Sequence, residues 1–86
     1  GFAKGKLYLN EQAVEVLKGA KAVSLLPVGV TRIDGEFEKD DIVKIMGPKG
    51  MQIGVGRVAY DSEEAVAVIG KHGQRPLVHY DYLYLE

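Results

Sequence analysis

The strongest structural signal in the sequence is a β-hairpin in its second half. Residues 42–46 and 51–60 are rich in valine and isoleucine, and they flank the segment Gly-Pro-Lys-Gly at residues 47–50. A type I turn prefers proline at its second position and glycine at its fourth, which is the order found here. The hairpin commits the middle of the chain to an antiparallel sheet, which the flanking segments must complete.

The segment before the hairpin predicts two strands, a helix and a turn. We expect a strand over residues 6–9, followed by a helix that has Asn10 as its N-cap and stops at Gly19. The apolar side chains of this helix recur at helical spacing: Ala13, Val14, Val16 and Leu17. Residues 24–26 read as a short buried strand ended by a proline, and the Asp-Gly pair at residues 34–35 predicts a tight turn.

A second helix and a last strand are predicted after the hairpin. Asp61 and Glu64 have the spacing of a capping box, and Gly70 marks the end of the helix. The side chains expected on its buried face are Ala65, Val66, Val68 and Ile69. Residues 77–85 read as the final strand. The total is five to six strands and two short helices, so we expect a mainly β fold, a small barrel whose ends or sides the helices cover.

Composition limits the class of protein. The 86 residues suffice for a single domain, and apolar residues at 47% with charged residues at 27% are typical of a globular chain. The lack of cysteine excludes disulfides and thiol chemistry, and favours the cytoplasm. No apolar run is long enough to span a membrane, so no membrane partner is expected. The net charge of -1 argues against a body that is basic throughout, although a local basic patch is compatible with it.

Four patterns in the sequence resemble catalytic or ligand sites, and none of them predicts one. The glycines at residues 54–56 match part of a dinucleotide fingerprint, but β-forming residues continue on both sides where a helix is required. The acidic run at residues 34–41 lacks the ordered spacing of a calcium loop, and two histidines seven residues apart do not suggest a metal site. Ser24, His79 and Asp81 lack the exposed elbow of a hydrolase nucleophile. We therefore predict no catalytic residue, no metal and no cofactor.

One group of residues is suited to nucleic-acid binding, because it combines cations with aromatic rings. Its members are Lys18, Lys21, Arg75, His79, Tyr80, Tyr82 and Tyr84. Cations neutralise phosphates and tyrosines stack on bases, which is the chemistry of such interfaces. A structural alternative stays open, since lysines near a helix C-terminus meet its dipole and alternating tyrosines on a strand commonly bury their rings.

Motifs along nearly the whole chain resemble one family, the C-terminal PUA domain of glutamate 5-kinases. The residues that carry the resemblance are Gly5-x-Leu7-x-Leu9, Ser24 to Val30 (Ser-Leu-Leu-Pro-Val-Gly-Val), Gly35 to Val43, Gly50, Gly54, Gly56, Tyr60, Ser62 to Glu64, Gly70-Lys71 and His79-x-Asp81-x-Leu83. The Ser-Leu-Leu-Pro-x-Gly segment is the most specific part.

The resemblance implies a PUA pseudobarrel that serves as an accessory module of a larger enzyme. That enzyme transfers the ATP γ-phosphoryl group to the side-chain carboxylate of glutamate, in proline biosynthesis. Its kinase domain would precede Gly1, and an oligomer is possible through this parent enzyme. The resemblance also implies an RNA surface at Lys18, Gly19, Lys21 and residues 78–82. The family usually has arginine and asparagine where this chain has Tyr80 and Tyr82, and tyrosine cannot replace a bidentate phosphate ligand. A structural or regulatory kinase module and an RNA-binding module are therefore the two hypotheses.

Overall fold

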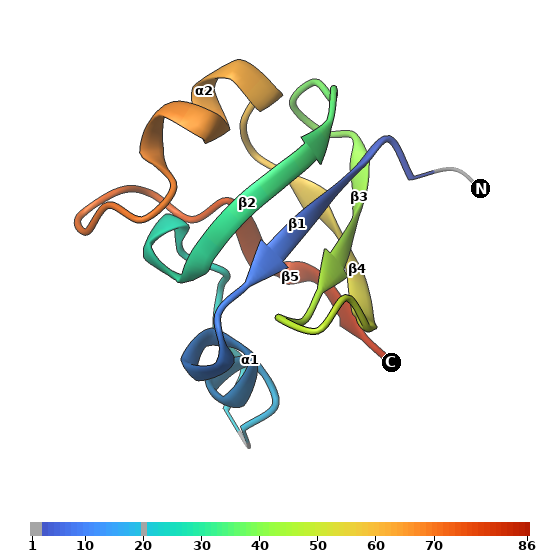
Figure 1. Cartoon of the computed structure of the whole chain (residues 1–86), viewed down its shortest axis with the longest axis vertical. Coiled ribbons are helices and arrows are strands. Elements are labelled where there is room, and N and C mark those ends of the chain that lie inside the picture. The colour runs from blue at the N-terminus through green and yellow to red at the C-terminus, as the bar shows by residue number, and fades with distance from the viewer. Residues whose placement is uncertain (1–2, 20) are drawn as a thin grey trace.

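A computed structural model describes residues 3–19 and 21–86, which form five strands, two short α-helices and one 3₁₀ turn (Figure 1). In chain order they are β1 (Gly5–Leu9), α1 (Glu11–Leu17), η1 (Pro27–Gly29), β2 (Val30–Gly35), β3 (Ile42–Met46), β4 (Gln52–Val58), α2 (Ser62–Val68) and β5 (Val78–Leu85). The mainly β fold class expected from the sequence is confirmed. No helix in the described part of the chain is long and apolar enough to cross a membrane.

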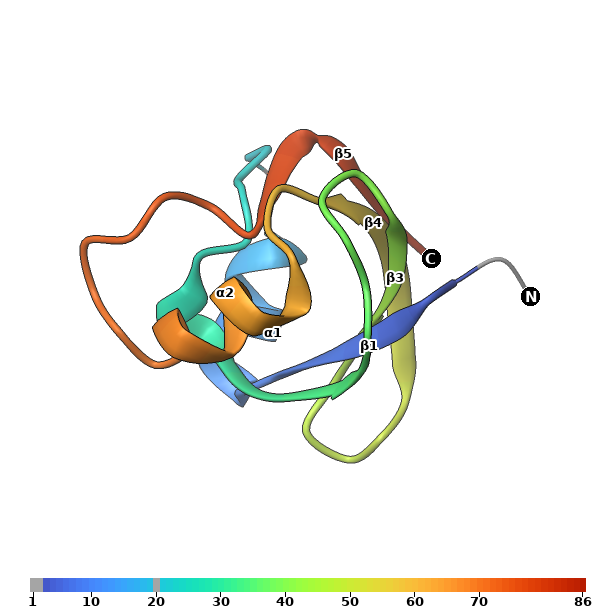
Figure 2. The same ribbon diagram turned by 90° about the horizontal axis from the view of Figure 1, so that it is seen from above.

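All five strands belong to one mixed sheet with the order β2-β1-β3-β4-β5. β1 runs parallel to β3, and every other neighbouring pair is antiparallel. Figure 2 shows the sheet curving around the interior, while α1 and α2 lie at opposite ends of the molecule in Figure 1. β2 and β5 form the two edges of the sheet, and an isolated bridge between Leu25 and Val78 covers the start of β5.

The core lies inside the curved sheet and draws on both halves of the chain. Side chains two residues apart point to the same face of a strand, and the strands supply alternating buried residues in this way. The fully buried aliphatic side chains are Leu7, Leu9, Leu25, Val30, Val43, Ile45, Val58, Leu77 and Val78. Phe37 and Tyr60, from loops far apart in the sequence, complete this cluster.

Two expectations for the first half of the chain were wrong. Residues 24–26 contribute a single bridge through Leu25, and Leu26 is 46% exposed, because Pro27 starts η1 directly after it. The Asp-Gly pair at residues 34–35 ends β2 and is no tight turn; Gly35 takes a φ of +84° opposite Gly5. β2 carries polar side chains on an edge of the sheet, so its apolar pattern was too weak to predict it.

The helix boundaries follow the predicted caps. Asn10 Oδ1 accepts a hydrogen bond from the Ala13 N–H at 2.8 Å, and α1 ends before Gly19. The Asp61 N–H donates to the Glu64 carboxylate at 3.4 Å, which completes a capping box at the start of α2. Val66, which was expected on the buried face of α2, is 56% exposed instead, and Val16 of α1 is 52% exposed, because each lies beside the buried stripe of its short helix.

Candidate nucleic-acid interface

The last strand, β5, carries most of the predicted site and is irregular where it does so. Val55 pairs with Tyr84 and Gly56 with Leu83, but Val58 already pairs with Val78. Only Arg57 of β4 therefore lies opposite residues 79–82, and these four residues bulge out at the edge of the sheet. In a regular strand, successive side chains point alternately to the core and to solvent. A bulge interrupts this alternation and allows neighbouring side chains to point to solvent.

The three alternating tyrosines of β5 are exposed. Tyr80, Tyr82 and Tyr84 keep 48%, 40% and 60% of their surfaces accessible. The alternative that their rings are buried at a rim is therefore wrong for this strand. His79 joins them, since its ring centroid lies 4.4 Å from that of Tyr80 and 6.3 Å from that of Tyr82. The strand presents a row of aromatic side chains to solvent.

Arg57 is a cation of this surface that the sequence analysis missed. Its guanidinium carbon lies 3.7 Å from the centroid of the Tyr82 ring, a cation–π distance, and its Nε lies 3.9 Å from Asp40. The signal is the strand register: Arg57 follows Val55 by two residues, Tyr82 precedes Tyr84 by two, and Val55 pairs with Tyr84. The pairing of β4 with β5 had to be known before this signal could be used.

Arg75 does not join the tyrosines of β5. Its guanidinium carbon lies 4.2 Å from the centroid of the Tyr60 ring, and the Tyr60 hydroxyl donates to the Arg75 carbonyl at 2.9 Å. Tyr60 is 4% exposed, so Arg75 covers a core residue. This contact gives Arg75 a structural role at the loop before β5.

Arg32 makes a similar stack on an aromatic ring, that of Tyr8, whose centroid lies 4.0 Å from the guanidinium carbon. The hydrogen bond with Tyr8, more than the nearby Asp34, raises the pKa of Arg32 above its ordinary value.

The remaining predicted residues lie at the end of α1 and shortly after it. Lys18 is the C-cap of α1, and Lys18, Gly19 and Lys21 are all exposed. Residues 24 and 25, further along the chain, make two contacts with the start of β5: the Leu25 N–H donates to the Val78 carbonyl at 2.9 Å, and the Tyr80 N–H donates to Ser24 Oγ at 3.0 Å. The fold therefore attaches residues 24 and 25 to the start of β5, and these contacts do not include the predicted lysines.

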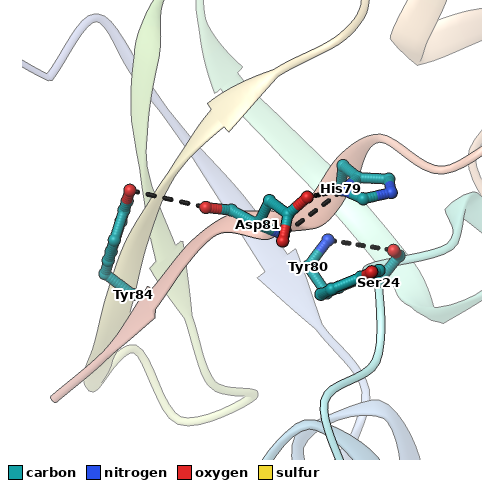
Figure 3. A network of polar contacts seen from close by, with 5 residues as sticks. All are labelled: Ser24, His79, Tyr80, Asp81 and Tyr84. Carbon is teal, nitrogen blue, oxygen red and sulfur yellow. Dashed lines mark hydrogen bonds and ion pairs between the residues drawn. The ribbon is translucent and has the colours of Figure 1, made fainter.

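Ser24, His79 and Asp81 do not join into a triad, because Ser24 contacts the backbone of Tyr80 while His79 contacts Asp81 (Figure 3). Ser24 Oγ accepts the Tyr80 N–H, whereas His79 Nδ1 accepts the Asp81 N–H at 3.3 Å and lies 3.5 Å from the Asp81 carboxylate. The hydroxyl that a triad would activate instead holds the backbone of the bulge. This geometry fixes the position of β5 and does not prepare Ser24 for attack.

The acidic run at residues 34–41 comes together with the acidic residues at the start of α2 on another face. An open hollow of about 550 Å³ is lined by Lys4, Glu36, Phe37, Glu38, Asp41, Asp61, Ser62 and Glu63. Two of its carboxylates accept backbone N–H groups, Asp41 from Glu38 at 2.9 Å and Asp61 from Lys39 at 2.8 Å. Within residues 3–19 and 21–86, no three His, Asp or Glu side chains converge as metal ligands would. These carboxylates order their own loop.

Comparison with known proteins identifies the class of domain. The sequence model of the PUA domain matches residues 5–80. A PUA domain from Aeropyrum pernix superposes with a TM-score of 0.75 at 23% identity, over 88% of this chain and 41% of that one. An H/ACA ribonucleoprotein bound to a substrate RNA contains a similar fold, with a TM-score of 0.64 at 20% identity, over 95% of this chain and 22% of the other. The chain belongs to the PUA domain family.

The curated relatives are glutamate 5-kinases, so the resemblance seen in the motifs is confirmed. The enzyme of Bacteroides thetaiotaomicron is 58% identical over the whole of this chain, and that of Chlorobaculum tepidum is 41% identical over 99% of it. This chain matches their C-terminal region and spans about 24% of their length. The matching region of these kinases is therefore a PUA domain.

Proposed function

We propose that this chain is the accessory PUA domain of a cytoplasmic glutamate 5-kinase and has no catalytic role of its own. The observation that carries the proposal is the 58% identity to such a kinase over the entire chain. Its partner is then the kinase domain of the same polypeptide, and its role is to stabilise that enzyme, assemble it or regulate it. Phosphoryl transfer to the glutamate carboxylate would take place in the kinase domain.

The geometry of the described residues is compatible with an accessory role. Phosphoryl transfer requires a phosphate cradle, a bound cation and positioned catalytic groups. Here Gly54 and Gly56, the glycines that resemble part of a phosphate-binding motif, lie within β4. Because they have no side chain, β5 packs closely against β4 at these two positions. Ser24 and Asp61 direct their side-chain oxygens at backbone N–H groups. Ser24 and Asp61 are thus engaged in holding the fold, and we expect neither a cofactor nor a metal in this domain.

A domain exchange tests the proposal directly. This chain would replace the matching quarter of the Bacteroides thetaiotaomicron glutamate 5-kinase, and glutamate- and ATP-dependent phosphorylation, thermal stability and sedimentation would be measured. We expect the chimera to match the parent enzyme, while the isolated chain is inactive and the truncated enzyme is less stable, differently assembled or differently regulated. A truncated enzyme that equals the parent in all these properties would contradict an accessory role.

RNA binding is the second candidate function, and the exposed aromatic and cationic surface of β5 favours it. Tyr82 carries the Arg57 guanidinium on one face, and Tyr80 is paired with His79. Exposed rings beside cations are able to stack on bases and neutralise phosphates. A similar fold occurs in a ribonucleoprotein solved with its substrate RNA. Lys18 and Lys21, which are exposed at and after the end of α1, are the further cations that we assign to this function.

Titration with a labelled tRNA pool at low and physiological salt tests this second function. Removal of a phosphate-binding lysine, by Lys18→Ala or Lys21→Ala, should weaken binding severalfold and make it less dependent on salt. Lys49→Ala is the matched control, because Lys49 is exposed in the turn between β3 and β4. No saturable binding at low salt would exclude the RNA function, and equal affinities of all three variants would exclude this lysine site.

A further inference from the structure

The exposed apolar surface of this domain is concentrated at one edge of the sheet. Nine large hydrophobic side chains are exposed among the described residues, and five of them lie on β5 or at the turn beside its end. These five are Met51, Tyr80, Tyr82, Tyr84 and Leu85. The Gln52 side chain donates to the Glu86 carboxylate at 2.6 Å, which brings the turn against the end of β5. An apolar edge strand is a template for pairing with another strand.

The backbone of β5 offers hydrogen-bonding groups only over its last residues. The Glu86 N–H donates to the Ile53 carbonyl at 2.9 Å, so Glu86 faces β4. Residues along an antiparallel strand direct their backbone groups to alternate sides. Tyr84 therefore also faces β4, as its pairing with Val55 requires, while Leu83 and Leu85 direct their N–H and C=O groups to the open edge.

The first part of the same edge is already occupied. Leu25 bridges Val78, and Ser24 Oγ accepts the Tyr80 N–H. The Asp81 N–H donates to His79 Nδ1 at 3.3 Å, and the Asp81 carbonyl accepts the Tyr84 hydroxyl at 3.4 Å. An incoming strand thus finds its partners at Leu83 and Leu85. The charged side chains of the described residues near this stretch are carboxylates and Arg57, and residues 81–86 include none of the lysines or prolines that commonly block an edge.

We propose that two copies of this chain pair through β5, antiparallel about a twofold axis at Tyr84. Leu83 of each copy then exchanges two backbone hydrogen bonds with Leu85 of the other, so four bonds form from the groups that face the open edge. Tyr84 lies opposite Tyr84 of the second copy, where side chains approach most closely and aromatic pairs are favourable. A register shifted by one step toward the N-terminus would need backbone hydrogen bonds from Asp81 to the second copy. This register is disfavoured, because the Asp81 N–H and C=O groups are already bonded within their own chain.

Charge complementarity supports a second copy as the occupant. In this register Tyr82 lies opposite Glu86 of the second copy. The Arg57 guanidinium, 3.7 Å from the Tyr82 ring centroid, is therefore the cation nearest to that glutamate, whose carboxylate would turn from Gln52 of its own copy to pair with Arg57, twice in the dimer. The two Asp81 carboxylates lie at opposite ends of the paired segment, away from one another. Because only a few residues pair on each side, the interface is smaller than those of stable dimers, and the association is weak.

Sedimentation of the chain as it stands tests the pairing. We expect a reversible monomer–dimer equilibrium between roughly 10 µM and 1 mM, the range of weak complexes. Slower amide exchange at Leu83 and Leu85 should accompany the dimer. Tyr84→Lys sets two cations against each other at the axis and should raise the dissociation constant about tenfold. Tyr80→Lys makes the same change at an exposed tyrosine outside the paired segment and should leave it unchanged.

A second variant probes the backbone itself. Leu85→Pro removes an N–H that faces the open edge and leaves the ladder to β4 intact, a place where an edge strand tolerates proline. We expect it to abolish the dimer while circular dichroism stays that of the parent chain. A monomer at all concentrations, a dimer that resists Tyr84→Lys, or growth beyond two copies would each overturn the proposal, since twofold pairing closes at the dimer.

Discussion

Individual residues stabilise this domain by capping helices, by covering buried side chains and by allowing strands to approach closely. Asn10 caps α1 with its side-chain oxygen, and Arg75 covers the buried ring of Tyr60. Gly54 lets β5 approach β4, because a Cβ built there would lie 2.5 Å from the Tyr84 carbonyl oxygen and 3.0 Å from the Leu85 Cα. The fold thus depends on small and polar residues as well as on the core.

Gly54→Ala should destabilise the domain by about 2 kcal/mol, the usual range for overpacking, because the added methyl group meets backbone that has no room to shift. Gly47→Ala is the matched control. A Cβ at Gly47 would make ordinary contacts, the nearest at 3.6 Å, so we expect a change within about 0.5 kcal/mol. Urea unfolding measures both variants, and equal stabilities would show that β5 does not lie this close to β4.

At the scale of elements, the two helices are short and depend on their ends. Each has seven residues, too few to be stable in isolation, so caps and packing must hold it. α2 buries Ala65 and is closed by Gly70, which has a φ of +77°. Asp61 serves two elements, since its carboxylate also accepts the Lys39 N–H of the loop before β3.

Asp61→Ala should lower the free energy of unfolding by at least about 1 kcal/mol, because α2 loses its cap and the Lys39 N–H loses its acceptor. Asp61→Asn keeps a side-chain oxygen and a good N-cap, so most of this stability should remain. Thermal unfolding followed by circular dichroism compares the variants. If alanine were tolerated as well as asparagine, the capping role of Asp61 would be refuted.

At the scale of the whole molecule, one sheet and one core join segments that are distant in the sequence. β1 lies between β2 and β3, and the Leu25 bridge to Val78 links the first third of the chain to the last strand. The buried side chains come from both sides of the turn at residues 47–50, among them Leu7 and Val43 before it and Val58 and Val78 after it. Neither half contains a complete core.

We therefore expect fragments 1–48 and 49–86 to be unfolded separately and to regain the spectrum of the intact domain when mixed. The break falls in an exposed turn, where a cut removes few contacts. Circular dichroism and amide exchange follow the recovery. Fragment 1–48 with Leu7→Asp is the control and should not restore it, because Leu7 is fully buried. A fragment that folds alone would show that the core is divided.

The sequence alone determined the local features, because their causes lie within a few residues. The hairpin about residues 47–50, the caps at Asn10 and Asp61 and the last strand follow from turn chemistry and short-range hydrogen bonds. Its motifs also indicated the family.

Only the tertiary structure decided which segments are neighbours. Four features depend on the register between distant strands. They are the polar edge strand β2, the stacking of Arg57 on Tyr82, the packing of Arg75 on Tyr60 instead of on the β5 tyrosines, and the exposure of those tyrosines. That register is set by burial of the whole core, in which every strand competes for the same partners. No local pattern of residues encodes the outcome of that competition, so it could not be read before the fold was known.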